Sequence, residues 1–225
     1  MLGVVPAARP PHAADASGSS PAVAGILLTG GKSRRMGSDK ALLEIEGTPA
    51  AERVLRVLES VARPIVEVGP GITGARSVLE DPPGSGPLVS LAAGGRALRE
   101  LGHLGPALVL ACDLPLIDTA TLRMLARWPG PSSVVPVIGG RPQGLCARWA
   151  ARDLAAADQL AKAGGRSVKA LLDRSEVKLL PPELWPPGVD AATLADADSP
   201  EDLERLGVSW RSPGVRPGTT PTSDA

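Results

Sequence analysis

The 225-residue sequence contains neither phenylalanine nor tyrosine, and its only aromatic residues are four tryptophans. It therefore lacks the aromatic rows on which proteins stack single-stranded nucleic acid. Lysine and arginine total 24, as do aspartate and glutamate, so the formal net charge is zero. Without a broad basic field we expect no nucleic-acid partner. The core must come from leucine, valine, isoleucine and alanine, which suits a buried parallel sheet covered by helices.

Cysteine and histidine are scarce, with two of each. Cys112 and Cys146 lie far apart and form no Cys-x-x-Cys pair, so we expect two buried, reduced thiols and neither a disulfide framework nor a zinc site. His12 and His103 have no nearby Ser or Cys in a nucleophile setting, which argues against Ser–His or Cys–His catalysis. No apolar run is long enough to span a bilayer, and we expect a cytoplasmic protein without a membrane partner.

The two ends differ in composition from the middle of the chain. Residues 1–22 and 209–225 are rich in proline, glycine, serine and threonine and lack sustained apolar periodicity. We interpret them as a disordered leader and a disordered tail. The segment between them, residues 23–208, is long enough for one domain with a full apolar core.

Short apolar runs alternate with helical patterns through residues 23–208. Strands are predicted at 25–28, 65–68, 77–79, 107–111, 133–137, 144–147 and 177–180, with the fifth and sixth joined as a hairpin across Gly139–Gly140. Helices are predicted to start at the N-caps Thr48, Asp118 and Ser199, and to cover 88–101, 150–163 and 167–172. This alternation predicts an α/β fold, a three-layer, doubly wound, mostly parallel sheet, whose ligands bind beyond the carboxyl ends of the strands.

The first strand runs into the segment GILLTGGKSRRMGSDK, residues 25–40. Its end, Gly31-Lys32-Ser33, matches a Walker A loop, but the position that needs the first glycine of that motif is Ile26. Paired glycines still let backbone N–H groups approach phosphate oxygens closely, and four cations, Lys32, Arg34, Arg35 and Lys40, can neutralise negative charge. The loop is either an anion site or a solvated basic loop.

Aspartates lie at three other places in the predicted fold where a strand ends or a helix begins. Asp113 comes directly after the apolar strand 107–111, where it is either a Mg²⁺ ligand or a turn residue before Leu114–Pro115. Asp81 opens a proline-rich loop and could accept hydrogen bonds from a base or ribose, or serve the turn alone. Asp196 and Asp198 are two residues apart, so in an extended segment both face the same side. They are either a further metal site or the residues that lead into the last helix, whose N-terminus favours negative charge.

Five motifs in order resemble one known family. They read LLTGGKSRRMGSDKALLEIEG, LEDPPGSGPLVSL, LACDLPLID, RPQGLCARW and ADADSPEDLERL. Together they are similar to the MobA-like nucleotidyltransferases, and within that family to the molybdenum cofactor guanylyltransferases. The resemblance covers nearly all of residues 24–206 and implies a Rossmann-like nucleotidyltransferase fold.

The resemblance implies an enzyme that transfers GMP from GTP to molybdopterin with Mg²⁺ as cofactor and releases pyrophosphate. It implies transient contact with molybdopterin-synthesis proteins or apo-molybdoenzymes. Lys40, Arg35 and Asp113 are the implied catalytic residues, and Asp113 with Asp198 the implied metal ligands. The implied nucleotide-binding residues are Leu28, Thr29, Gly30, Gly31, Arg34, Lys40, Asp81 and Asp113.

The sequence departs from the family pattern at four positions in or near these motifs. Thr29 stands where alanine is usual, and Gly69 stands where an asparagine often contacts the nucleotide. Asp196 and Asp198 replace asparagines, so they would repel phosphates unless a metal or Arg141 compensates.

Two other interpretations remain open at the level of sequence. A related transferase would use CTP or another phosphorylated acceptor. A non-catalytic carrier of nucleotide or molybdopterin would not need both Lys40 and Asp113, which the sequence retains.

Overall fold

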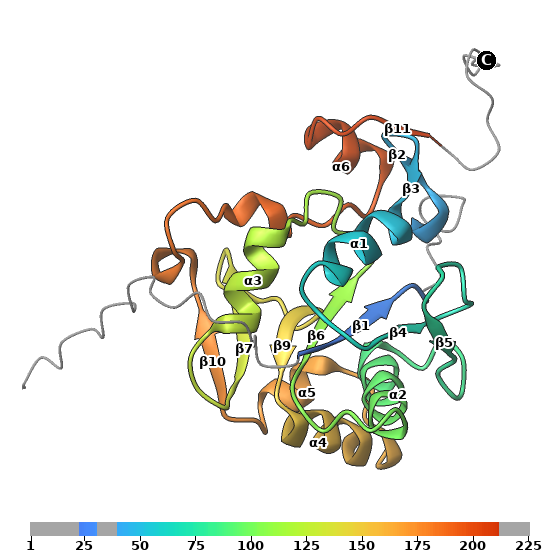
Figure 1. Cartoon of the computed structure of the whole chain (residues 1–225), viewed down its shortest axis with the longest axis vertical. Coiled ribbons are helices and arrows are strands. Elements are labelled where there is room, and N and C mark those ends of the chain that lie inside the picture. The colour runs from blue at the N-terminus through green and yellow to red at the C-terminus, as the bar shows by residue number, and fades with distance from the viewer. Residues whose placement is uncertain (1–22, 31–39, 212–225) are drawn as a thin grey trace, which may run out of the picture.

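The computed structural model describes residues 23–30 and 40–211, with Lys40 described for its backbone alone. In this part of the chain a sheet lies between two layers of helices (Figure 1). One face is covered by α1 (Ala50–Glu59) and α3 (Thr119–Arg127), and the other by α2 (Pro87–Glu100), α4 (Ala151–Lys162) and α5 (Val168–Leu172). This arrangement confirms the predicted three-layer α/β fold. The predicted leader and the loop residues 31–39 lie outside the described residues.

The main sheet is mostly parallel. Its strands in the described ranges are β1 (Ala24–Leu28), β4 (Ile65–Val68), β5 (Arg76–Val78), β6 (Ala107–Ala111), β7 (Ser133–Ile138), β8 (Arg141–Pro142), β9 (Cys146–Trp149) and β10 (Val177–Leu180). Their order is β10-β7-β9-β6-β1-β4-β5, with β8 paired to β7. β1 runs parallel to β4 and β6, β4 to β5, and β10 to β7, whereas β9 is antiparallel to β6 and β7. The carboxyl ends of β1, β4 and β6 therefore meet at one edge.

The side chains of β1 alternate between the two layers. Leu27 packs in the cluster on the α1 and α3 face, and Ile26 and Leu28 pack in the cluster on the α2 and α4 face. Gly94 lets α2 lie directly on this strand, because a Cβ there would come within 2.6 Å of the Ile26 Cγ2. Each fully buried aliphatic side chain contributes roughly 1.5–3 kcal/mol to folding.

The start of α1 differs from the prediction. Thr48 and Pro49 form β3 (Thr48–Pro49), which pairs with β2 (Glu44–Ile45), and β2 pairs in turn with β11 (Trp210–Arg211). Pro49 is therefore the N-cap residue, no side chain caps the helix, and the predicted Thr48 cap is wrong. The pairing that removes Thr48 from the helix involves a strand from the far end of the described chain. This strand also lies within the segment that we interpreted as a tail.

The other helix starts agree with the prediction. Asp118 Oδ1 accepts a hydrogen bond from the Thr121 N–H at 2.8 Å, and Ser199 forms a capping box at the start of α6 (Pro200–Arg205). The described chain also contains three short 3-10 helices, η1 (Lys40–Leu42), η2 (Pro182–Leu184) and η3 (Ala191–Leu194). No helix within the described ranges has the length and apolarity needed to cross a membrane.

The turn at Gly139–Gly140 forms, but with a partner that differs from the predicted one. This two-residue turn pairs β7 with the short β8, so Val137 lies opposite Pro142. The chain then leaves the hairpin before Cys146, and β9 pairs along its whole length with β6. The expected pairing of β9 with β7 survives at Val134 and Arg148.

A buried carboxylate joins α2 to α4. Asp158 of α4 accepts hydrogen bonds from Arg96 Nη1 at 2.6 Å and from Lys162 Nζ at 2.9 Å, and Arg99 Nη2 lies 3.8 Å away. Burial alone would raise the pKa of Asp158, but the hydrogen bonds from Lys162 and Arg96 hold it below its usual value. A carboxylate with these partners stabilises the packing of the two helices while it is ionised.

Replacing Asp158 with asparagine is expected to lower the free energy of unfolding by about 1–3 kcal/mol at pH 7, because three cations lose their shared partner. The pKa is lower in the folded chain, so this contribution is present above the unfolded pKa of about 4 and disappears as pH falls through the folded pKa. Urea unfolding at pH 7 and at pH 3 measures both values.

The matched control is Asp173→Asn, which removes an exposed partner of Lys169 and should cost less than about 0.5 kcal/mol. An equal difference between wild type and Asp158→Asn at the two pH values would contradict the electrostatic explanation.

Candidate active site

The ends of four parallel strands, β6, β1, β4 and β5, are tied together at one edge of the sheet. The Cys112 N–H, after β6, donates to the Leu28 carbonyl at 3.1 Å. The Gly69 N–H, after β4, donates to the Val78 carbonyl at 2.9 Å, and the Thr29 N–H donates to the Val68 carbonyl at 3.1 Å. The predicted contact residues Leu28, Thr29 and Gly30 and the predicted metal ligand Asp113 therefore lie on neighbouring strand ends.

The backbone of the first two loop residues is already bonded to β4. The N–H groups of Thr29 and Gly30 both donate to the Val68 carbonyl, at 3.1 and 3.2 Å. Gly30 is exposed and the Thr29 side chain is buried. These two N–H groups are therefore used within the protein, which argues against the expected approach of the Gly30 N–H to a phosphate oxygen.

The start of η1 lies close to the end of β6. Ala41 and Cys112 are buried in one small apolar cluster with Ala51. Lys40 and Asp113 each adjoin a member of that cluster, so their backbones belong to the same edge of the sheet. Gly31, Arg34 and Arg35, which the sequence assigned to this site, lie outside the described residues.

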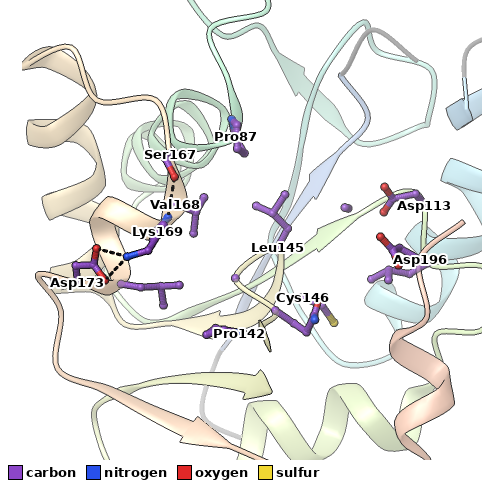
Figure 2. Close-up of a pocket in the computed structure, with 15 residues that line it drawn as sticks. Pro87, Asp113, Pro142, Leu145, Cys146, Ser167, Val168, Lys169, Asp173 and Asp196 are labelled. Carbon is purple, nitrogen blue, oxygen red and sulfur yellow. Dashed lines mark hydrogen bonds and ion pairs between the residues drawn. The ribbon is translucent and has the colours of Figure 1, made fainter. Parts of the chain in front are cut away.

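A cavity of about 600 Å³ opens beside Asp113. Figure 2 shows Asp113 and Asp196 together on one side of it, with Ser167, Lys169 and Asp173 across from them. Leu145, Cys146 and Pro142 of the β8–β9 region and Val168 of α5 supply apolar walls. Lys169 Nζ lies 2.7 Å from Asp173 Oδ2, and both side chains are exposed. Asp113 thus stands between β1 on one side and this cavity on the other.

The segment that carries Asp196 and Asp198 is joined to Asp113. The Ala197 N–H donates to the Asp113 carbonyl at 2.9 Å, and Asp196 lines the same cavity as Asp113. Asp198 is exposed, and its N–H donates to Asp202 Oδ2 at 2.9 Å. Within the described ranges no cluster of three or more Asp, Glu, His or Cys could hold a metal ion. A Mg²⁺ ion needs only one or two carboxylates when substrate phosphates complete its ligands, and this donor set fits that pattern.

Asp81 lies in an exposed loop that a glutamate organises. Glu80 Oε1 accepts from the Gly84 N–H at 2.5 Å, and Glu80 Oε2 accepts from the Ser90 hydroxyl of α2. The loop after β5 is thereby fixed to the start of α2. Asp81 follows Glu80 in this loop and is exposed. The role of Asp81 as a nucleotide contact stays a prediction.

Sequence reasoning missed a buried carboxylate at this edge. Glu67, in the middle of β4, is fully buried and accepts hydrogen bonds from Thr29 and Thr73. Burial would raise the pKa of Glu67, but the hydrogen bonds from Thr29 and Thr73 lower it below its usual value. The signal was present in Ile-Val-Glu-Val, because a glutamate at the centre of an apolar strand needs internal partners.

The two cysteines are buried and unbridged, as predicted. Cys146 lines the cavity, but burial and the nearby negative charge of Asp113 raise the pKa of its thiol far above the usual value. Cys146 is therefore a protonated wall residue and no nucleophile.

Comparison with known proteins gives the chain its family. The sequence model of the family described as "MobA-like NTP transferase domain" matches residues 25–178. A protein of Opitutus terrae named "Probable molybdenum cofactor guanylyltransferase" is 34% identical over 204 residues, which cover 84% of this chain and 96% of that protein. A Mycobacterium tuberculosis protein of the same name is 36% identical over 163 residues, covering 68% and 81% of the two chains.

Solved structures agree on the fold. The molybdopterin-guanine dinucleotide biosynthesis protein A of Archaeoglobus fulgidus superposes with a TM-score of 0.68 at 23% identity, covering 82% of this chain and 96% of that one. A Mycobacterium tuberculosis protein in complex with manganese superposes with a TM-score of 0.58 at 20% identity, covering 82% and 97%. With the family match over residues 25–178 and relatives above 30% identity, the chain belongs to the MobA-like NTP transferase family.

Proposed function

We propose that this protein transfers GMP from GTP to molybdopterin, with release of pyrophosphate and with Mg²⁺ as its metal. The observation that carries the proposal is the position of Asp113. It follows β6, between the strand end that leads into the glycine loop and a cavity large enough for a second substrate. A cytoplasmic location and transient contacts with molybdopterin-synthesis proteins or apo-molybdoenzymes stay predictions.

The two substrates fit on opposite sides of Asp113. In the proposed arrangement the triphosphate lies over the loop that follows β1, and the nucleoside extends toward the ends of β4 and β5. Molybdopterin occupies the cavity of about 600 Å³ on the β9 and α5 side. The walls of this cavity carry an amide at Gln143, a hydroxyl at Ser167 and an ammonium at Lys169, groups that can bond a pterin ring and a phosphate.

The reaction is a displacement at the α-phosphorus. An oxygen of the terminal phosphate of molybdopterin forms a bond to the α-phosphorus of GTP, and the bond from that phosphorus to the bridging oxygen breaks. Pyrophosphate leaves with the electron pair. Such a transfer needs positioning and charge neutralisation more than covalent chemistry. In the proposal, Lys40, Arg34 and Arg35 hold the phosphates, and the carbonyls of Thr29 and Gly30 accept hydrogen bonds from the nucleoside.

Asp113 is the proposed main ligand of the metal, and Asp196 and Asp198 are the nearby carboxylates that can join it. When bound, Mg²⁺ would neutralise phosphate charge and orient the α-phosphate. A metal at this place also removes the repulsion that extra carboxylates would exert on phosphates. The manganese in the Mycobacterium tuberculosis structure of the same fold supports a divalent ion in general.

The direct test incubates the purified chain with Mg²⁺, molybdopterin and each nucleoside triphosphate in turn. We expect GTP alone to yield a product with the mass of molybdopterin plus GMP, with one pyrophosphate released for each product. Mass analysis of the cofactor and a pyrophosphate assay measure both. A product from CTP would favour the cytidylyl alternative, and nucleotide binding without pyrophosphate release would favour a carrier.

Asp113→Asn is expected to lower kcat at least about a hundredfold, because the amide removes the negative charge that holds the metal. The circular dichroism spectrum and the unfolding midpoint should stay close to wild type. The control is Asp118→Asn in the same loop, since asparagine caps a helix about as well as aspartate. Wild-type turnover by Asp113→Asn would refute the metal role.

Lys40→Ala is expected to lower kcat/KM for GTP by about tenfold to a hundredfold, the range for loss of a charged hydrogen bond to phosphate. Lys40→Arg should recover part of this loss, because it restores the charge in a different shape. Steady-state kinetics with varied GTP measures the effect, and Lys178→Ala, at an exposed position of β10, is the control. Unchanged kinetics in Lys40→Ala would remove this lysine from the site.

A further inference from the structure

A fully buried carboxylate holds the two strand ends that face the proposed nucleotide. Glu67 lies opposite Leu27 in the register of β4 with β1, and its side chain has no solvent exposure. Its strand neighbours Val66 and Val68 are buried in the apolar cluster on the other face. A carboxylate at such a position costs free energy of folding unless each oxygen has partners.

Both oxygens of Glu67 have partners, and they come from two separate segments. Oε1 accepts from Thr29 Oγ1 at 2.6 Å, from the Gly71 N–H at 2.9 Å and from the Ile72 N–H at 3.0 Å. Oε2 accepts from the Thr73 N–H at 2.9 Å and from Thr73 Oγ1 at 2.6 Å. One carboxylate therefore fixes the residue that opens the glycine loop and the loop that follows β4.

The hydrogen bond from Thr29 to Glu67 holds the threonine hydroxyl close to Gly69. A Cβ at Gly69 would lie 2.0 Å from Thr29 Oγ1 and 2.8 Å from the backbone nitrogen of Gly30. The threonine hydroxyl thus takes the space that any side chain at position 69 would need. The two departures from the family pattern at these positions are a single coupled arrangement, with Glu67 as its acceptor.

The loop held by Glu67 reaches two more parts of the site. Ile72 packs against the cluster of Ala41, Ala51 and Cys112. Ala41 follows Lys40, and Cys112 precedes Asp113. The contacts of Glu67 therefore extend to the start of the glycine loop directly, and to the backbones of Lys40 and Asp113 through Ile72.

We propose that Glu67 is a positioning residue for the nucleotide half of the active site, a role that rests on the proposed function. It does not touch substrate. It sets the place of Thr29 and Gly30 and, through the loop 69–73, the place of the segments that carry Lys40 and Asp113. Asp113 lines the acceptor cavity, but its other walls come from elements such as β9 and α5, and none of the five hydrogen bonds of Glu67 reaches a lining residue directly.

A purely structural role predicts a different kinetic result. A variant that merely unfolds in part has fewer active molecules, so Vmax falls while both KM values stay constant. Loss of positioning changes the KM of one substrate. Misplaced loops weaken the binding of GTP and leave most walls of the acceptor cavity in place. The separation of the two KM values is therefore the decisive measurement.

Glu67→Gln keeps the shape of the side chain and replaces one acceptor oxygen with an NH₂ group that faces N–H and O–H donors. We expect KM for GTP, and the Kd of a fluorescent GTP analogue without acceptor, to rise about tenfold. KM for molybdopterin should stay within about twofold. Amide hydrogen exchange should become faster at residue 73 or at residues 71 and 72, according to which of the two oxygens the NH₂ group replaces.

The matched control is Asp153→Asn, which removes another buried carboxylate, on α4, that accepts a hydrogen bond from the hydroxyl of Ser133 in β7. It lies near the opposite edge of the sheet, where β9 ends at Trp149 beside Ala107, and it should lower stability without altering either KM. If Glu67→Gln fails to fold, Thr73→Val removes one donor to Oε2 and should raise the Kd of the analogue in the same direction by a smaller factor.

Unchanged analogue binding and unchanged KM for GTP in a folded Glu67→Gln would overturn the inference, as would equal rises in both KM values. Failure of the proposed function has a different signature. A wild-type chain that binds the GTP analogue but makes no product with molybdopterin refutes the transferase, while the Kd comparison still decides the role of Glu67.

Discussion

The parallel pairing of β1 between β4 and β6 is the constraint on which the rest of the structure depends. It brings Thr29, Gly69 and Cys112 to one edge, and hydrogen bonds between the three strand ends keep them there. The pairing is stable because β1 is buried on both faces, and α2 comes close enough through Gly94 to cover it. A ligand at this edge meets groups from several strands that one buried layer holds rigidly.

The two sides of Asp113 at this edge differ in their chemical character. On the β1 and β4 side the described backbone is pinned by hydrogen bonds, and a buried ionised carboxylate lies beneath it. On the β9 and α5 side there is a cavity with mixed apolar and polar walls. A rigid backbone surface suits a nucleoside that must be held in one orientation, and a cavity with apolar and polar walls suits a heterocyclic acceptor. The same division explains why the Cys146 thiol stays protonated, since it lies buried on the Asp113 side of that cavity.

Local sequence signals predicted most of the fold, and long-range pairing accounts for the differences. The runs that became β1 and β6 are continuous and apolar, the run of β4 is apolar apart from Glu67, and Asp118 and Ser199 cap their helices through neighbours three residues away. Thr48 was misassigned because β2, its partner, also pairs with Trp210 and Arg211, which no local pattern reveals. At the site, Asp113 was recognisable from its place after a strand. The partners of Glu67 were not, because they lie on two loops whose approach depends on the fold.

The coupling of Thr29, Glu67 and Gly69 shows why single positions can mislead when a sequence is compared with a family. Taken alone, Gly69 is the loss of a side chain that could contact a nucleotide, and Thr29 is a small change from alanine. In the structure the threonine hydroxyl excludes a side chain at 69 and donates to Glu67, which in turn holds Gly71, Ile72 and Thr73. Alanine at 29 would leave Glu67 short of a partner, and a side chain at 69 would meet both the threonine hydroxyl and the backbone nitrogen of Gly30, so substitutions at these two positions are expected to be non-additive.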